Sequence, residues 1–193
     1  MSEWGHCRRH HSPHIVVCRR TWNSAHAQMT ADYEISLATP DDIPGILTLQ
    51  EPNLVERGGG LSVRQTANWF RNVVVEKSVV VGRRDGKVVG YVLGTSLAAQ
   101  AHVAIIQTML RALPAPPDCY LYGPVCVAET ERGKGLAAAL FEVLQTHMDG
   151  RPAMTFVRTE NGQSLRAHRK MGMRELGTFM SEGIPHIALT FTV

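Results

Sequence analysis

The sequence predicts a single domain of the α/β (α+β) class. Its 193 residues, 44% of them hydrophobic, suit one hydrophobic core rather than two. Stretches with strand-like alternation mix with stretches of helical periodicity along the chain. A hairpin lies before the middle of the chain and a strand–helix–strand unit after it, an order typical of helices packed on a mixed sheet.

The strand signals come from β-branched runs, and the clearest flank the tight-turn dipeptide Asp85-Gly86. The expected strands are 33–38, the two arms of 78–98, 119–128, 153–159, 174–180 and 186–193. The helix signals are apolar residues at helical spacing after capping or turn residues. The expected helices are 39–50, 63–77, 98–113, 133–148 and 162–171, with a glycine-containing loop at 51–62.

The strand at 119–128 is interrupted by Gly123-Pro124. Proline has no N–H group to donate to a neighbouring strand, so it is confined to edges and bulges. We therefore expect this strand to bulge, or to separate from a neighbour, at this point.

Residues 1–28 differ from the rest of the chain and are expected to be a disordered extension of a domain at 29–193. They hold five of the nine histidines and two of the four cysteines, without a hydrophobic period. An alternative is a metal site, but the spacing fits none of the usual zinc patterns, so no metal is predicted. The ligands for such a site would be Cys7, His10, His11, His14 and Cys18.

Charge and hydropathy limit the partners and the location. The net charge of +3 comes from four arginines against one glutamate in residues 1–28, which leaves the domain neutral. A neutral domain argues against nucleic-acid binding. No run of eighteen apolar residues occurs, so no membrane partner is expected. The few cysteines favour a reduced, cytoplasmic protein.

Gly133 and Gly135 lie just before an apolar helical pattern and suggest a phosphate site. The P-loop pattern fails because Lys134 is followed by glycine rather than Ser or Thr. The dinucleotide pattern G-x-G-x-x-A is present, but five residues separate it from the strand that ends near Val127. The third interpretation is a pyrophosphate at a helix N-terminus, where glycines leave the amides accessible. The buried stripe of this helix would be Leu136, Leu140, Val143 and Leu144.

The third interpretation agrees with a known motif. The segment RGKGLA, residues 132–137, resembles motif A of the GNAT superfamily of acyl-CoA-dependent N-acetyltransferases, Q/R-x-x-G-x-G/A. The resemblance extends over most of 33–193. It implies a mixed, mostly antiparallel sheet of six to seven strands, four to five flanking helices, and splayed fourth and fifth strands. It also implies acetyl-CoA as co-substrate, bound by Val125, Cys126, Val127, Arg132, Gly133, Lys134, Gly135, Leu136, Ala137, Asn161 and Ser164.

The chain departs from the family's pattern in the fourth family helix. Many members carry Y-x-x-x-G-F there, and the tyrosine is thought to protonate the leaving thiolate. Here His168 stands in that place, and the spacing of Asn161, Ser164, His168 and Gly172 is similar to that of the phosphinothricin and methionine sulfoximine acetyltransferase branch. Asn161 would then contact the pantetheine arm, and His168 would either donate a proton or pack beside the cofactor.

The implied reaction is direct transfer of an acetyl group to a primary amine, of a small molecule or a peptide, in a ternary complex. The carboxylate that several members use as base is replaced here by Leu121. Substitutes left open are Tyr120, Tyr122, Glu129, His186 and a relay through water. Cys126 as a covalent acyl carrier is disfavoured because nothing in the sequence would lower its pKa.

A non-catalytic acyl-CoA-binding or regulatory module is the alternative from another class, since both usual catalytic residues are missing. The acceptor pocket is expected, by family analogy, to be shaped by 51–62, by 63–77 and by the hairpin that strands 174–180 and 186–193 form with the segment 182–186 between them. A homodimer is the default oligomeric state.

Overall fold

The computed structural model describes residues 28–29 and 32–192 of the chain. The proposed extension, apart from Gln28, and its five candidate metal ligands lie outside the described residues, so the division at residue 28 stays a prediction. One sheet runs through the described part, in the strand order β1-β2-β3-β4-β5-β6-β8-β7. The strands are β1 (Gln28–Met29), β2 (Glu34–Leu37), β3 (Val79–Arg84), β4 (Lys87–Ser96), β5 (Tyr120–Val127), β6 (Ala153–Arg158), β7 (Arg174–Ser181) and β8 (Ile184–Phe191).

Neighbouring strands are antiparallel except β5 and β6, which are parallel. The predicted mixed, mostly antiparallel sheet is therefore confirmed, with the two-residue β1 as an eighth strand beyond the six to seven expected. The α-helices among the described residues are α1 (Ile43–Gln50), α2 (Ala67–Val75), α3 (Ala104–Ala112), α4 (Leu136–His147) and α5 (Gly162–Lys170).

Four helices begin later than predicted, each for a local reason. α1 starts at Ile43 because Pro40–Asp42 form a separate 3₁₀ turn. α2 starts after Thr66, whose hydroxyl oxygen accepts a hydrogen bond from Trp69 N at 3.2 Å. α3 starts at Ala104 because 98–100 form a separate 3₁₀ turn. α4 starts at Leu136 rather than at 133, because Gly135 has left-handed backbone angles that cannot continue a right-handed helix.

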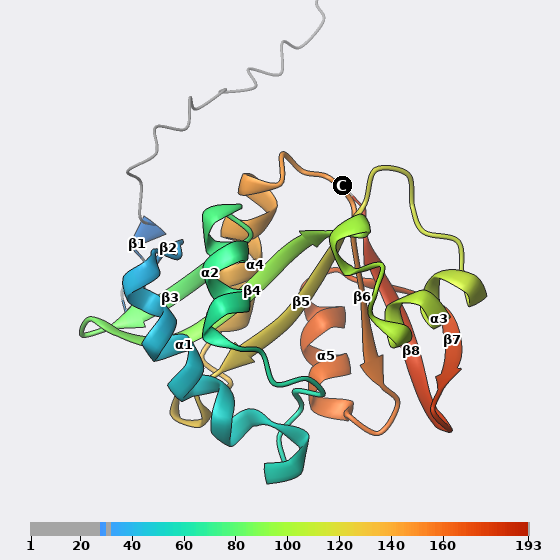
Figure 1. The fold of residues 1–193 in the computed structure, drawn as a ribbon, viewed down its shortest axis with the longest axis horizontal. Helices are drawn as coiled ribbons and strands as arrows, with labels where there is room; N and C mark the ends of the chain where they lie inside the picture. The colour runs from blue at the N-terminus through green and yellow to red at the C-terminus, as the bar shows by residue number, and fades with distance from the viewer. Residues whose placement is uncertain (1–27, 30–31, 193) are drawn as a thin grey trace, which may run out of the picture.

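Two layers of helices cover the sheet (Figure 1). α4 and α5 pack on one face, where the predicted stripe of α4 is buried against β2, β3, β4 and β5. The other face is covered by α1 and α2 over β3 and β4, and by α3 over β7. Both faces of the central strands are therefore buried, in agreement with their nearly continuous apolar sequence.

Two glycines of the sheet let α4 approach closely. Gly82 on β3 and Gly90 on β4 are paired across the strands. A Cβ atom built on Gly90 would lie 2.9 Å from Leu136 Cδ2 and 3.1 Å from Leu140 Cδ1, and one built on Gly82 would lie 2.9 Å from Leu136 Cδ1. The first turn of α4 is thus seated in a notch that side chains would close.

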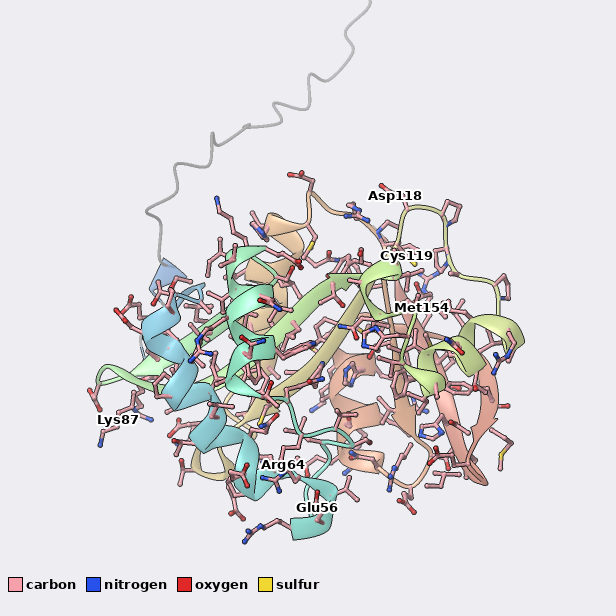
Figure 2. The ribbon with its side chains drawn as sticks, in the orientation of Figure 1. Glu56, Arg64, Lys87, Asp118, Cys119 and Met154 are labelled. Carbon is pink, nitrogen blue, oxygen red and sulfur yellow. The ribbon has the colours of Figure 1, made fainter. Side chains whose placement is uncertain are left out.

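The sheet splits between β5 and β6. These strands pair only at Tyr120 with Ala153 and at Leu121 with Met154, the closed end that Cys119 and Met154 mark in Figure 2. The register of β5 on β4 shifts between Val92 and Gly94, opposite the predicted interruption. The splay and the bulge expected at Gly123-Pro124, whose peptide bond is cis, are both present.

Candidate functional site

The start of α4 is open to solvent. Gly133 and Gly135 have φ angles of 77° and 87°, in the left-handed region that favours glycine. No heavy atom lies within 4 Å of a Cβ atom built on either residue. A side chain at these positions would therefore meet no protein atom and would project into the space over the loop.

The backbone amides of this loop are left for another acceptor. Within the described residues, no backbone carbonyl accepts a hydrogen bond from the amides of 133–137, and the next two amides, of Ala138 and Ala139, bond to Gly135 O at 3.0 and 3.1 Å. Gly135 is the N-cap residue and supplies no side-chain cap. A helix N-terminus with unpaired N–H groups and the positive end of the dipole attracts anions. The loop therefore fits a diphosphate such as that of coenzyme A.

The free edge of β5 presents a second set of backbone groups. The amide of Ala128 donates to Val89 O on β4 at 2.8 Å. Because backbone groups of successive residues in an antiparallel strand point to alternate sides, those of Cys126 face β4. Those of Val125 and Val127 face the split. Of the three residues predicted on this strand, the structure thus brings Val125 and Val127 to the split, whereas the backbone of Cys126 pairs with β4.

The two basic side chains of the loop are turned back onto the protein. Arg132 Nη2 donates to Asn53 Oδ1 at 2.6 Å, and its Nε donates to Val127 O at 3.4 Å. Asn53 is buried in the segment between α1 and α2, so Arg132 ties the loop to that segment. Lys134 Nζ lies 3.2 Å from Glu131 Oε2. The sequence alone assigns both charges to the anion, whereas the structure also gives each a protein partner.

Glu131 is the residue near this loop that the sequence reasoning missed. It is 6% exposed, and its Oε2 accepts hydrogen bonds from Tyr33 Oη at 2.7 Å, Arg84 Nη1 at 3.0 Å and Lys134 Nζ at 3.2 Å. Its Oε1 lies 3.3 Å from the hydroxyl of Thr130. The hydrogen bond from Tyr33, with the charges of Lys134 and Arg84, lowers the pKa of Glu131 to about 2. The same bond raises the pKa of Tyr33 to about 12, so the carboxylate is ionised and the phenol neutral near pH 7.

The thiol of Cys126 is buried on the α1 side of the sheet, 3.9 Å from Leu49 O. Contrary to the expectation from sequence, a cation does act on it, because the charge of Arg132 lowers its pKa. Burial outweighs this charge and raises the pKa to about 12. The thiol is therefore protonated near pH 7 and does not supply a nucleophilic thiolate.

The start of α5 is satisfied by its own chain. Asn161 Oδ1 accepts from Ser164 N at 3.0 Å, which caps the helix and fixes the orientation of the Asn161 side chain. Its amide nitrogen lies 3.2 Å from where a Cβ atom on Gly60 would stand, which brings the 51–62 loop close to α5. The shared helix face predicted for Asn161, Ser164 and His168 is confirmed, since Ser164 contacts both of the others.

His168 is buried between α5 and β5. Its Nδ1 lies 2.7 Å from Ser164 O and 3.3 Å from Ser164 Oγ, and its ring meets Tyr122 edge to face at 5.6 Å. Because a carbonyl oxygen only accepts, we assign the ring proton to Nδ1. Burial lowers the pKa of His168, so the ring is neutral near pH 7. A neutral ring in this tautomer can accept a proton at Nε2 but has none to donate there.

The residues left open as bases differ in their surroundings. Burial raises the pKa of Tyr120 and of Tyr122. The Tyr122 ring packs edge to face on Phe141 of α4, and the Tyr122 hydroxyl is buried without a hydrogen-bond partner in the described part of the chain. Glu129 is exposed in the turn before Arg132. His186 is 3% exposed and stacks on Phe179 at 5.2 Å.

His186 of β8 pairs with Arg158, the last residue of β6, at the end where β6 has separated from β5. Its Nδ1 donates to Ile184 O at 2.9 Å, and burial lowers its pKa. It is therefore neutral near pH 7, with the lone pair on Nε2. His186 and His168 are thus both neutral near pH 7, a protonation state that suits a base.

Two findings concern metals and membranes. Across residues 28–29 and 32–192, no group of three or more His, Cys, Asp or Glu side chains is placed to hold a metal ion. None of the helices in this same part of the chain has the length and apolar character needed to cross a bilayer.

Comparison with known proteins identifies the fold and the family. A putative acetyltransferase, yncA, from Salmonella typhimurium, solved with its cofactor acetyl-CoA, is 14% identical with a TM-score of 0.60 over 84% of this chain and 94% of its own. A GNAT-family acetyltransferase from Streptococcus agalactiae is 18% identical with a TM-score of 0.65 over 83% and 95%. A ribosomal-protein-alanine N-acetyltransferase from Brucella melitensis is 20% identical with a TM-score of 0.59 over 82% and 99%.

A search of curated protein sequences gives no match. The profile described as the acetyltransferase (GNAT) family matches residues 44–173, which is more than half of the chain and includes the α4 loop, the split and α5. This chain therefore belongs to the GNAT family of acetyltransferases, which use acetyl-CoA as co-substrate.

Proposed function

We propose that the protein is an N-acetyltransferase that moves the acetyl group of acetyl-CoA directly to a primary amine in a ternary complex. The observation that carries this proposal is the open start of α4 beside the split between β5 and β6. The first feature offers unpaired amides and open space for a diphosphate. The second offers the free edge of a strand for an extended, amide-containing arm.

The residues that would hold coenzyme A follow from this arrangement. The amides of 133–137 would bind the diphosphate, with Lys134 and Arg132 adding positive charge nearby. Val125 and Val127 would bind the pantetheine arm through their backbone groups. The Asn161 side-chain nitrogen would contact the same arm from α5, and Ser164 would help to fix the His168 ring. Acetyl-CoA, when bound, supplies an activated acetyl group.

The acceptor amine must lose a proton before it can attack, and the chain offers two neutral histidines for this task. We propose His186 as the first candidate base, since it pairs with Arg158 at the end where β6 has separated from β5. His168 is the second candidate base. Because its proton is on Nδ1, its Nε2 can accept a proton or the ring can pack beside the cofactor, and both roles suit it better than the role of general acid. Replacing each by asparagine and following the pH profile of kcat/KM separates the two roles.

The acceptor itself is proposed from two resemblances. The Brucella melitensis neighbour is named for an alanine residue of a ribosomal protein, so a peptide with an N-terminal alanine is one candidate. The spacing of Asn161, Ser164 and His168 is similar to that of the phosphinothricin and methionine sulfoximine branch, so a small amino-acid analogue is the other. Figure 2 shows Arg64 and Glu56, which pair at 3.4 Å in the segment between α1 and α2 that we expect to border this acceptor.

Thermal-shift titration of the full chain with acetyl-CoA, coenzyme A and NADH tests cofactor binding. A ligand at a hundred times its Kd adds about 2.7 kcal/mol of stability, which is a shift of several degrees at this size. We expect a shift with both coenzyme A forms and none with NADH. Release of free thiol is then measured with N-terminal alanine peptides, methionine sulfoximine, phosphinothricin and a buffer control. Absence of a coenzyme A shift would contradict the proposal.

A non-catalytic acyl-CoA-binding module is the second candidate, favoured by the apolar Leu121 at the place of the usual carboxylate. Under this alternative coenzyme A still binds, but no amine in the panel releases thiol above the buffer rate. A cytoplasmic location and a homodimer stay predictions.

A further inference from the structure

A buried charge cluster lies beside the α4 loop, and of its members only Lys134 belongs to the groups that would touch coenzyme A. It consists of Glu131, Tyr33, Arg84 and Lys134, which come from the loop itself, from the residue before β2 and from the end of β3. Glu131 lies two residues before Gly133, and its carboxylate is the acceptor that the other three share. The Glu131 carboxylate therefore attaches the loop to β3 and to the residue before β2.

Two of the three donors reach the Glu131 carboxylate from the β2 and β3 side of the sheet. The hydroxyl of Tyr33 reaches Glu131 at 2.7 Å from a buried ring, and Arg84 reaches it at 3.0 Å from β3. Arg84 is carried by β3, which also supports the first turn of α4 through Gly82, and Tyr33 directly precedes β2, which packs against α4 as well. The carboxylate thus fixes the loop from one side, while Leu136 seats the helix start from the other.

The charges of the cluster also suit an anion nearby. Two cations, Arg84 and Lys134, surround one carboxylate, and the charge of Asp32 also acts on Arg84, which leaves the charge of Lys134 beside Gly133 and Gly135. Without Glu131, the two cations would repel each other and Lys134 would lose its fixed partner. Glu131 therefore orders the cations rather than cancelling their attraction for a diphosphate.

We propose that Glu131 is a positioning residue for coenzyme A, which holds residues 129–135 on Tyr33 and Arg84 so that the amides of 133–137 stay aligned for the diphosphate. This inference rests on the proposed coenzyme A site. A positioning role of this kind affects Kd and KM for acetyl-CoA rather than kcat, because Glu131 acts on binding and not on the chemistry at the acetyl group.

A second buried carboxylate provides a matched control. Asp42 is 7% exposed and binds the preceding arginine of β3, with Arg83 Nε at 2.7 Å from Oδ1 and Arg83 Nη2 at 2.6 Å from Oδ2. Because successive residues of a strand point to opposite faces, Arg83 joins α1 while Arg84 joins the α4 loop. The two pairs have the same chemistry on adjacent residues, but only one touches the loop.

The test compares Glu131→Gln with Asp42→Asn in the full chain. Kd for coenzyme A is measured by calorimetry, and KM for acetyl-CoA and kcat are measured with whichever amine turns over. We expect Glu131→Gln to raise Kd and KM about tenfold while kcat changes less than about twofold. Asp42→Asn is expected to lower Tm while Kd and KM stay at the wild-type values.

Further variants cover the case in which Glu131→Gln does not fold. Tyr33→Phe removes only the hydroxyl, Arg84→Gln removes the guanidinium group with its charge, and each is expected to raise Kd about threefold. If the folded variants bind coenzyme A as the wild type does, or if Asp42→Asn weakens binding equally, the positioning role is overturned while the proposed function stands. If the wild type binds no coenzyme A, both the proposed function and this inference are overturned.

Discussion

The starts of α4 and α5 lie on the same face of the sheet and are built in opposite ways. α5 begins at an asparagine whose oxygen caps the Ser164 amide, as Thr66 caps α2. α4 begins at a left-handed glycine with no side-chain cap, and the amides before it have no backbone acceptor in the described part of the chain. Because α1 and α3 also lack side-chain caps, the feature that sets the start of α4 apart is its pair of left-handed glycines, whose surroundings are clear of protein atoms and accessible to a ligand.

The largest expected effect comes from closing the open start. Gly135→Ala places a methyl group in the space over the loop and is expected to weaken coenzyme A binding about a hundredfold. Gly86→Ala is the matched control, because Gly86 has a φ of 72° and a Cβ atom built on it would also have no heavy atom within 4 Å. Both variants carry the same left-handed strain, about 1 kcal/mol or more. Calorimetric titration that finds equal Kd values for the two variants would contradict the distinction between the two helix starts.

The seat of the open start is expected to matter next. Gly90→Ala drives a Cβ atom to 2.9 Å from Leu136 Cδ2 and should lift the first turn of α4 from the sheet. Overpacking of this kind costs about 1–3 kcal/mol of unfolding free energy, which urea denaturation measures. We expect coenzyme A binding to weaken about fivefold as well, because the loop moves with the helix.

Shortening the side chain that meets the new methyl group provides the control for this change. Gly90→Ala combined with Leu136→Val should recover part of both the stability and the affinity. A Gly90→Ala variant with reduced stability and unchanged affinity would mean that the seat of α4 does not set the geometry of the loop.

Sequence alone predicts the open start of α4 better than the groups around it. Gly133 and Gly135 can be identified because left-handed, unobstructed backbone demands glycine, a requirement that is visible in neighbouring letters. Glu131 cannot, because its partners Tyr33 and Arg84 are 98 and 47 residues away and only folding brings them together. Pairs this distant leave no periodic signal in one sequence.

The fold is predictable to a similar depth. Strand and helix order, the Asp85-Gly86 hairpin and the splay at Gly123-Pro124 follow from local turn chemistry and are confirmed. Asn161 illustrates the limit of spacing arguments. Its predicted place on the Ser164 and His168 face is correct, but spacing does not tell that its oxygen is used as a helix cap.

Removing the cap at the start of α5 should have a smaller effect, the loss of stability that is usual when a helix loses its N-cap. Asn161→Ala removes the cap and is expected to cost about 1 kcal/mol of stability, as Thr66→Ala should at α2. If the Asn161 nitrogen also contacts pantetheine, only Asn161→Ala will weaken coenzyme A binding, by about threefold. Denaturation and calorimetry of both variants decide this, and equal Kd values would remove Asn161 from the cofactor site.

The smallest expected effect is a dependence of stability on pH that comes from His168 of α5. Burial lowers the pKa of His168, so the unfolded chain, with an ordinary pKa of about 6.5, binds a proton more readily than the folded chain. The contribution of the buried neutral ring is therefore present above about pH 6.5 and is lost as the pH falls through that value toward the lowered pKa.

Urea midpoints at about pH 7.5 and about pH 5.5 measure this loss, and His168→Asn should reduce it. His186, whose pKa burial also lowers, contributes in the same direction, so His186→Asn serves as the parallel variant. The open start of α4 adds nothing to this slope, because its amides do not titrate. A pH dependence that both single variants leave unchanged would show that the two rings are not held neutral by burial, which would also remove the argument for either of them as a base.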